Sequence, residues 1–294
     1  MKRKVFFITA DNLGLSREQI DYKDLEILTF PVFVDGKEYR QSDEYNAQWL
    51  ISKYENEKAV AKSSTLVQRE VAEVVEKNHS NYDLIIHVLM SSGISAASFT
   101  VAENVRKQFE NIIPIINIDS RQTVNGVGNV LLGVIDIIRN NEELTINEII
   151  KLSQQVVENT FSYFVLPDMN YLYKGGRIGK AQSLMGSILH IIPIVGTMGN
   201  EKEGVVVPVG KGRTFKQVNT QIIDSIKAKM EEKSASKIKR AIIICGYGNK
   251  NQDAISDFIE MVKTIPCDDL IIGKPNLIDA VYCGPGAYGV SVYI

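Results

Sequence analysis

Hydrophobic and polar positions along the first half of the chain alternate between two periods. Short runs of β-branched residues predict strands at residues 5–9, 83–89 and 113–118. Apolar residues at helical spacing predict helices at residues 67–77, 95–109 and 124–139. Strands that alternate with helices in this way are typical of βαβ units around a parallel sheet. We therefore predict an α/β fold whose N-terminal domain is a doubly wound, mostly parallel sheet.

The pattern changes near the middle of the chain. An amphipathic segment at residues 145–161 begins with acidic residues that suit the positive end of a helix dipole, and it leads into an apolar strand near Phe164 and Val165. We place the domain boundary here, with an N-terminal α/β domain at residues 1–160 and a C-terminal α/β domain at residues 161–294. A chain of 294 residues is at the upper limit for one hydrophobic core, and clefts between domains are common ligand sites.

Two further patterns complete the predicted elements. In the C-terminal half, strands are predicted at residues 192–196, 205–209, 241–245, 269–272 and 289–293, and long helices at residues 213–233 and 252–264. These elements predict a second α/β layer. In the N-terminal half, the dipeptide Asp35-Gly36 lies between two strand-like runs and predicts a two-residue hairpin turn.

Charge and composition exclude several classes of protein. The 33 Lys and Arg residues and 35 Asp and Glu residues give a net charge of -2 and are spread along the chain, so no footprint for nucleic acid is present. Hydrophobic residues make up 45% of the chain and charged residues 23%, as in ordinary globular proteins. No apolar stretch approaches the roughly 20 residues of a membrane span. We expect a cytoplasmic protein without stable membrane insertion.

Cysteine and histidine are too scarce and too scattered to indicate a metal site. Cys245, Cys267 and Cys283 show no CxxC spacing, so neither a disulfide framework nor zinc is indicated. The three histidines, His79, His87 and His190, are also far apart in the sequence. The same scarcity weakens the case for nucleophilic catalysis. The composition therefore predicts no metal, no cofactor and no enzyme activity.

Hydroxyl residues gather where three predicted strands of the first domain give way to loops or helices. The segments are Ser63-Ser64-Thr65, Ser91-Ser92-Gly93-Ile94-Ser95, and Asp119-Ser120 followed by Thr123. Ligands of open α/β sheets bind outside the carboxyl ends of the strands, where helix N-termini favour anions. A serine is also an ordinary helix cap, so one hydroxyl alone does not decide between capping and binding. The number of hydroxyls at residues 91–98 favours an anionic headgroup.

A second glycine-rich segment, Tyr171-Leu-Tyr-Lys-Gly-Gly-Arg-Ile-Gly-Lys, contains Gly176 and Arg177. Glycine permits close backbone approach, and the planar guanidinium suits a carboxylate or a phosphate. The segment has neither Walker A nor GxGxxG spacing, and Arg177 could instead brace loop carbonyls. The apolar run at residues 181–194 is either core or the wall of a tunnel. Tyr282 and Gly284 begin a glycine and proline turn at residues 282–289, for which a backbone role is the simpler interpretation.

Together these segments resemble the DegV family, whose better-known members are similar to the fatty-acid-binding subunit of a bacterial fatty acid kinase. The segment YLYKGGRIGKAQSLMGSILHIIPIV resembles the family's YLxxGGRI and the apolar stretch that follows it. SSGISAAS resembles SSxLSGT, IDSRQTVNGVG resembles a DS followed by a GxG helix start, GKGRTFKQ resembles a KxR element, and GPGAYG resembles GPGTxG. The five matches occur in order and span nearly the whole chain.

The resemblance implies how a carboxylate would be held. In the family, a hydroxyl of the TS loop, a serine of the SSxLSGT loop and often a histidine two residues before GPG bind the acyl carboxylate. The corresponding residues are Ser63, Ser95 and Tyr282, so a phenol replaces the histidine. The family's TSQPS, SGT and TDS motifs also read differently here, as Ser63-Ser64-Thr65-Leu66-Val67, Ser95-Ala96-Ala97 and Thr9-Ala10-Asp11.

The resulting hypothesis is a two-domain protein with a ligand tunnel between its domains. It predicts a long-chain fatty acid as ligand and a fatty acid kinase catalytic subunit as a possible partner, with no chemistry by this chain. The predicted ligand-binding residues are Ser63, Ser64, Ser92, Gly93, Ser95, Ser120, Gly176, Arg177, Tyr282 and Gly284. The alternatives are an enzyme acting on a small acidic or phosphorylated metabolite, and a non-catalytic sensor with a degenerate pocket.

Overall fold

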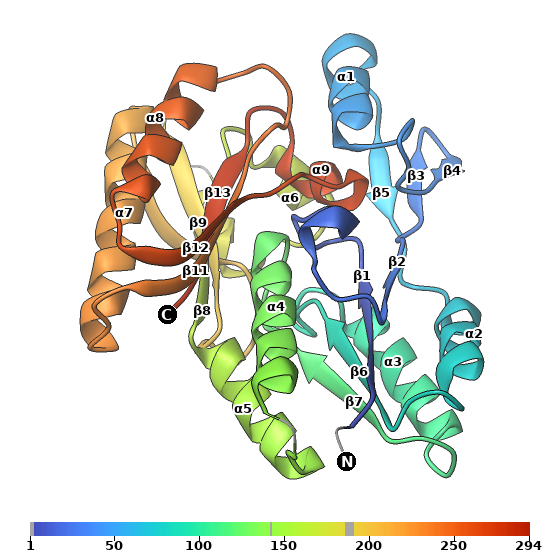
Figure 1. The fold of residues 1–294 in the computed structure, drawn as a ribbon. Helices are drawn as coiled ribbons and strands as arrows, with labels where there is room; N and C mark the ends of the chain where they lie inside the picture. The colour runs from blue at the N-terminus through green and yellow to red at the C-terminus, as the bar shows by residue number, and fades with distance from the viewer. Residues whose placement is uncertain (1–2, 142, 186–190) are drawn as a thin grey trace.

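The computed structural model describes residues 3–141, 143–185 and 191–294. Its first sheet has the strand order β2-β1-β6-β7, and all of its pairs are parallel. The strands are β1 (Val5–Ala10), β2 (Leu25–Leu28), β6 (Leu84–Leu89) and β7 (Ile115–Asp119). Every residue of β1 and β6 is buried, as expected for central parallel strands that are covered on both faces. The predicted parallel sheet is therefore confirmed (Figure 1).

Four helices cover this sheet. Helices α2 (Gln68–Asn78) and α3 (Ala96–Gln108) pack together, and α3 contacts β6 and β7. Helices α4 (Asn125–Asn140) and α5 (Ile146–Glu158) also pack together. Helix α4 contacts β6 and also three strands of the second sheet, and most of its residues are buried. It therefore lies between the two sheets (Figure 1).

The second sheet is mixed, with the order β10-β9-β8-β13-β11-β12. Only the pair β11 and β12 is parallel among its described ladders. Its strands are β8 (Thr160–Val165), β9 (Ile192–Met198), β10 (Val207–Gly212), β11 (Ile238–Ile244), β12 (Cys267–Ile272) and β13 (Tyr288–Tyr293). Helices α7 (Phe215–Glu232) and α8 (Gln252–Lys263) pack on one face of it. The predicted second α/β layer is confirmed, and the boundary at residue 160 stays a prediction.

A small third sheet contains the predicted hairpin. Strands β3 (Val32–Val34) and β4 (Lys37–Tyr39) pair antiparallel across Asp35 and Gly36, both of which have positive φ, as a type I′ turn requires. Strand β5 (Ala61–Ser63) pairs with the other side of β3 and was not predicted, because three residues carry no readable alternation. Ser63 is the last residue of β5, so this small sheet positions a predicted headgroup residue.

Several other elements differ from the sequence prediction. Those that it missed are β2, α1 (Ala47–Glu57), α6 (Asn170–Lys174), α9 (Leu277–Cys283) and the 3-10 helices Arg17–Gln19 and Gly179–Leu184. The helix predicted at residues 145–161 ends at Glu158, because residues 160–165 pair with β9 and β13. The apolar run at residues 181–194 is partly 3-10 helix and partly β9, and residues 186–190 lie outside the described ranges.

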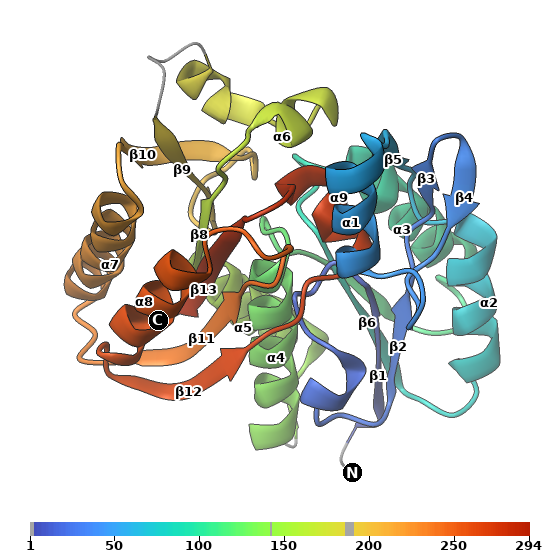
Figure 2. The same cartoon turned by 90° about the horizontal axis from the view of Figure 1, so that it is seen from above.

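Helix α9 corrects the prediction of a turn over residues 282–289. Tyr282 belongs to this helix, and the turn that follows comprises residues 284–287 with positive φ at Gly284 and Gly286. Asn276 and Asp279 form a capping box that begins the helix. Although α9 lies between β12 and β13 of the second sheet in sequence, it packs on α1 and β5 of the first half (Figure 2). The C-terminal segment thus reaches the same region as Ser63. None of the helices in the described ranges is both long and apolar enough to span a membrane.

Candidate functional site

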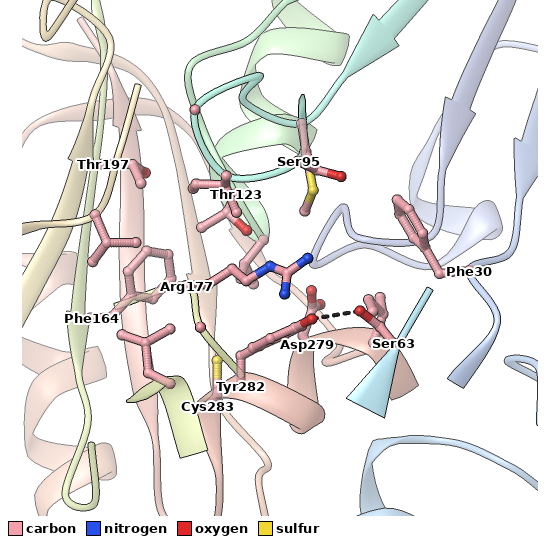
Figure 3. A pocket seen from close by; sticks show the side chains of 18 of the residues that line it. Phe30, Ser63, Ser95, Thr123, Phe164, Arg177, Thr197, Asp279, Tyr282 and Cys283 are labelled. Carbon is pink, nitrogen blue, oxygen red and sulfur yellow. Dashed lines mark hydrogen bonds between the residues drawn. The ribbon is translucent and has the colours of Figure 1, made fainter. Parts of the chain in front are cut away.

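A cavity of about 560 Å³ lies between the two halves of the molecule (Figure 3). Its volume is within the range of about 300–1,000 Å³ that is usual for small-molecule sites. The residues that line it come from the end of β5, the starts of α3 and α4, strands β8 and β9, the segment after α6, and α9. Much of the wall is apolar and buried, and its members are Phe30, Phe164, Leu166, Leu172, Val195, Val206 and Ile278. This wall suits a hydrocarbon.

Seven of the ten predicted binding residues line this cavity: Ser63, Ser64, Gly93, Ser95, Gly176, Arg177 and Tyr282. Ser63 and Tyr282 meet directly, with 2.5 Å between the Ser63 hydroxyl oxygen and the Tyr282 phenol oxygen. Either hydroxyl can be the donor in this contact. The O–H group that the contact does not use can donate to a further acceptor, such as a ligand oxygen. The contact joins β5 to α9, two elements that are far apart in the sequence (Figure 3).

Ser95 is the N-cap residue of α3, but its hydroxyl makes no capping hydrogen bond. It donates instead to the Ser98 hydroxyl at 2.8 Å, and the Ser98 and Thr65 hydroxyls lie 3.0 Å apart. Ser98 is 2% exposed and is not among the described residues that line the cavity. The first-turn residues Ala96 and Ala97 do line it, so the positive end of α3 faces the cavity. This arrangement favours a negatively charged ligand group.

Arg177 lies at the exposed side of the cavity. Its guanidinium donates to the Gly175 carbonyl at 2.7 Å, so it does brace its own loop, and its central carbon lies 5.8 Å from the centre of the Tyr282 ring. Ion pairs within the described part of the chain do not include Arg177. In Figure 3 the guanidinium points into the cavity. Its remaining donors are therefore available to an anion.

Three predicted residues are not among the described residues that line the cavity. The Ser92 hydroxyl donates to the Asp119 carboxylate at 2.5 Å, which ties the β6–α3 loop to the end of β7. Ser120 is fully buried, and its hydroxyl accepts a hydrogen bond from the backbone N–H of Gln122 at 3.1 Å. Gly284 has a φ of 69°, and a Cβ there would overlap the Tyr171 ring. These three residues shape the loops around the cavity, and a direct contact with ligand stays a prediction.

The sequence analysis did not identify a carboxyl group in the cavity wall. Asp279 lines the cavity and is 3% exposed, and burial, together with the nearby Asp11, raises the pKa of its carboxyl well above the ordinary value. Burial also raises the pKa of Asp11 to about 7. The capping-box pattern Asn276-Leu-Ile-Asp279 was a usable sequence signal for the start of this helix, but not for the burial of its acid.

The remaining nucleophile and metal candidates lie elsewhere or are unreactive. His87 is 2% exposed within β6, and burial lowers its pKa to about 3. Cys283 lines the cavity, but burial raises the pKa of its thiol to about 12. Among the described residues, no group of three or more His, Cys, Asp or Glu side chains is placed to hold a metal ion. His190 lies outside the described ranges.

A family model described as an uncharacterised protein of the DegV family matches residues 8–294. The chain belongs to the DegV family. The resemblance inferred from the five motifs is thereby confirmed. A DegV domain-containing protein of Clostridium acetobutylicum is 27% identical over 290 residues, which cover 98% of each chain.

Solved structures of the DegV family share the fold. A structure described as fatty acid binding of a DegV family protein from Thermus thermophilus has a TM-score of 0.87 at 21% identity, with 99% of each chain covered. A structure described as a stearic acid-binding protein from Eubacterium ventriosum has a TM-score of 0.83 at 18% identity, with 99% of this chain and 98% of that chain covered. At these identities the comparison establishes the DegV fold for this chain.

Proposed function

We propose that this DegV protein binds a long-chain fatty acid in the cavity between its two halves. The observation that carries the proposal is one cavity in which a buried apolar wall meets hydroxyls, a helix N-terminus and a guanidinium. The carboxylate would lie near Ser63, Ser95, Arg177 and Tyr282, and the tail against residues such as Phe164 and Val195. The descriptions of the Thermus and Eubacterium structures support the same class of ligand.

The energetics of this assignment divide between tail and headgroup. Burying a methylene contributes about 0.8 kcal/mol, so a tail of about a dozen carbons offers on the order of 10 kcal/mol before ordering costs. A hydrogen bond to a charged group contributes about 1.5–3 kcal/mol, whereas an unpaired buried carboxylate is strongly unfavourable. The apolar wall therefore provides most of the affinity, and the polar groups orient the acid.

We further propose that the chain performs no chemistry alone and presents the carboxylate to a separate kinase. Among the described lining residues there is no histidine, and the Cys283 thiol remains protonated near neutral pH, so no activated nucleophile faces the ligand. Arg177, Lys211 and Arg213 are exposed and are candidate contacts for an acidic partner. Lys180 is a fourth candidate contact for such a partner, but its ammonium group is paired with the carboxylates of Glu201 and Glu203. A kinase that acts on the carboxylate would form an acyl phosphate, and this reaction needs a phosphate donor from inside the cell. A cytoplasmic location is therefore part of this proposal.

The experiment that tests the ligand class is native mass spectrometry of the purified protein, followed by organic extraction. A co-purifying fatty acid, and saturable binding when the delipidated protein is reloaded, are expected. Recovery of a polar acidic metabolite in its place would instead support an enzyme, and failure to bind any fatty acid after delipidation would support a sensor with a degenerate pocket. Either outcome contradicts the proposal.

Two serines that differ in exposure to the cavity test the position of the headgroup. Ser95→Ala is expected to weaken fatty acid binding about tenfold or more, because it removes a hydroxyl that lines the cavity. Ser98→Ala is expected to weaken it less, since the Ser98 hydroxyl reaches the ligand only through Ser95 and Thr65. A fluorescent fatty acid displacement assay measures both, and equal losses would remove Ser95 from the headgroup site.

A further inference from the structure

The carboxyl of Asp279 is a buried acid in the wall of the cavity. One of its oxygens, Oδ2, accepts a hydrogen bond from the backbone N–H of Asn276 at 3.3 Å. The other oxygen, Oδ1, has no hydrogen-bond partner among the described residues, although the side chain lines the cavity. Asp279, Arg177, Ser63 and Tyr282 all line the same cavity (Figure 3). A buried acid with a free oxygen is costly unless it is protonated or finds a partner.

A second buried acid, Asp11, adds to the effect of burial on the pKa of Asp279. Asp11 follows β1 and is 5% exposed, and its Oδ1 accepts from the Phe30 amide at 3.2 Å while Oδ2 has no partner. Asn276 connects the two acids, since its side-chain amide donates to the Asp11 carbonyl and its backbone amide donates to Asp279. Two acids in one low-dielectric region cannot both ionise readily. Burial and this neighbour raise the pKa of Asp279, which favours the protonated form of its carboxyl, and that form can donate a hydrogen bond.

The other groups that face the two acids do not titrate near pH 7. Burial raises the pKa of Tyr54 on α1 and of Tyr247 far above neutrality, and it raises that of Cys283 to about 12. Tyr171 of α6, which packs on α9, also has a raised pKa because of its burial. Arg40, which lies near Asp11, is bound to the carboxylates of Glu38 and Glu70.

On the cavity side, the Arg177 guanidinium and the Tyr282 phenol both line the wall. Together with the Ser63 hydroxyl, these are the groups beside which Asp279 would meet a bound headgroup. A carboxylate has four lone-pair positions, which leaves room for a further donor.

We propose that Asp279 is a further headgroup-binding residue, which donates a hydrogen bond from its protonated carboxyl to the ionised carboxylate of the bound acid. The proposal rests on the fatty acid function argued above. The proton is shared between the Asp279 carboxyl and the ligand carboxylate, and no covalent bond forms or breaks elsewhere. The consequence is a dependence on pH. Binding of the fatty acid anion is favoured while Asp279 and Asp11 hold their protons. Binding weakens as pH rises and these two carboxyls ionise, because negative charges then face the ligand carboxylate.

The test compares a fatty acid with its uncharged methyl ester in the displacement assay. Asp279→Leu, which has similar volume and no donor, is expected to weaken binding of the acid about tenfold to hundredfold and to leave the ester within a few-fold. Asp279→Asn keeps a hydrogen-bond donor and the acceptor for the backbone N–H of Asn276. This variant is therefore expected to bind the fatty acid, with an affinity that changes less between pH 6 and 9 than that of the wild-type protein. Asp257→Leu, at an exposed position of α8, is the matched control and should change nothing.

A spectroscopic measurement keeps the test informative if Asp279→Leu fails to fold. An infrared difference spectrum at neutral pH is expected to show the carbonyl band of a protonated carboxyl that shifts when the acid binds, and this band is absent from Asp279→Asn. If the wild-type protein binds fatty acid and neither the affinity nor the infrared band depends on Asp279, this inference is overturned while the proposed function stands. If no fatty acid binds to any variant, the proposed function itself fails.

Discussion

Val206→Asp is expected to abolish fatty acid binding while leaving the protein folded. Val206 is 5% exposed, lines the cavity, and lies in the loop just before β10 rather than inside the sheet. In the empty cavity, water can hydrate the new carboxylate, whereas a bound hydrocarbon would displace that water. Removing an ion from water costs several kcal/mol, so a loss of more than about 3 kcal/mol, over a hundredfold in affinity, is expected.

Two comparisons make the Val206 result specific. Val206→Ile adds one methylene without charge and should bind within a few-fold of the wild-type protein. Thermal unfolding of both variants reports whether the fold is retained. Undiminished binding by a folded Val206→Asp protein would show that the tail does not pass this wall, and the assignment of the cavity would then be wrong.

Gln122→Ala is expected to cause the largest loss of stability. Gln122 follows β7 and is fully buried, and its side-chain oxygen accepts from the Ser162 hydroxyl at 2.7 Å and the Thr197 hydroxyl at 2.8 Å. Its amide donates to the Thr160 carbonyl at 3.0 Å. Truncation leaves the two buried hydroxyls without their acceptor, at about 1–3 kcal/mol each, and removes one of the donors to the Thr160 carbonyl, which keeps its hydrogen bond from the Gly199 N–H. We expect the free energy of unfolding to fall by about 3–5 kcal/mol.

Urea unfolding measures this change, and Gln154→Ala serves as the control. Among the described residues, the Gln154 side chain bonds only to Glu158 on α5, so its removal should change the free energy of unfolding by less than about 0.5 kcal/mol. A loss below about 1 kcal/mol for Gln122→Ala would mean that the two halves do not depend on this side chain for their attachment.

Patterns that are local in the sequence predicted most of the fold. The buried runs of β1 and β6, the alternating pattern of β7 and the amphipathic helices between them were readable because each element carries its own periodicity. The hairpin at Asp35 was readable because the turn type demands its residues. Strand β5 and helix α9 were missed because they are short and are stabilised by contacts with distant segments, and only the capping box at the start of α9 was a local signal.

The candidate site shows the same division. The hydroxyls of Ser63 and Ser95 could be predicted from motifs, and both line the cavity. Ser92 and Ser120 belong to the same kind of motif, but their hydroxyls are bound by protein groups that no local pattern reveals. Asp279 was missed because burial, not residue type, raises the pKa of its carboxyl, and burial is decided by the tertiary fold.

The contact between Ser63 and Tyr282 joins residues that are 219 positions apart in the chain. During synthesis, the first parallel sheet can form long before residues 277–283 leave the ribosome, but the cavity has no complete wall until α9 docks on α1 and β5. A nascent or C-terminally truncated chain should therefore be unable to capture a lipid. Lipid capture would begin only once α9 has docked, and a loaded molecule would report that these distant segments have come together.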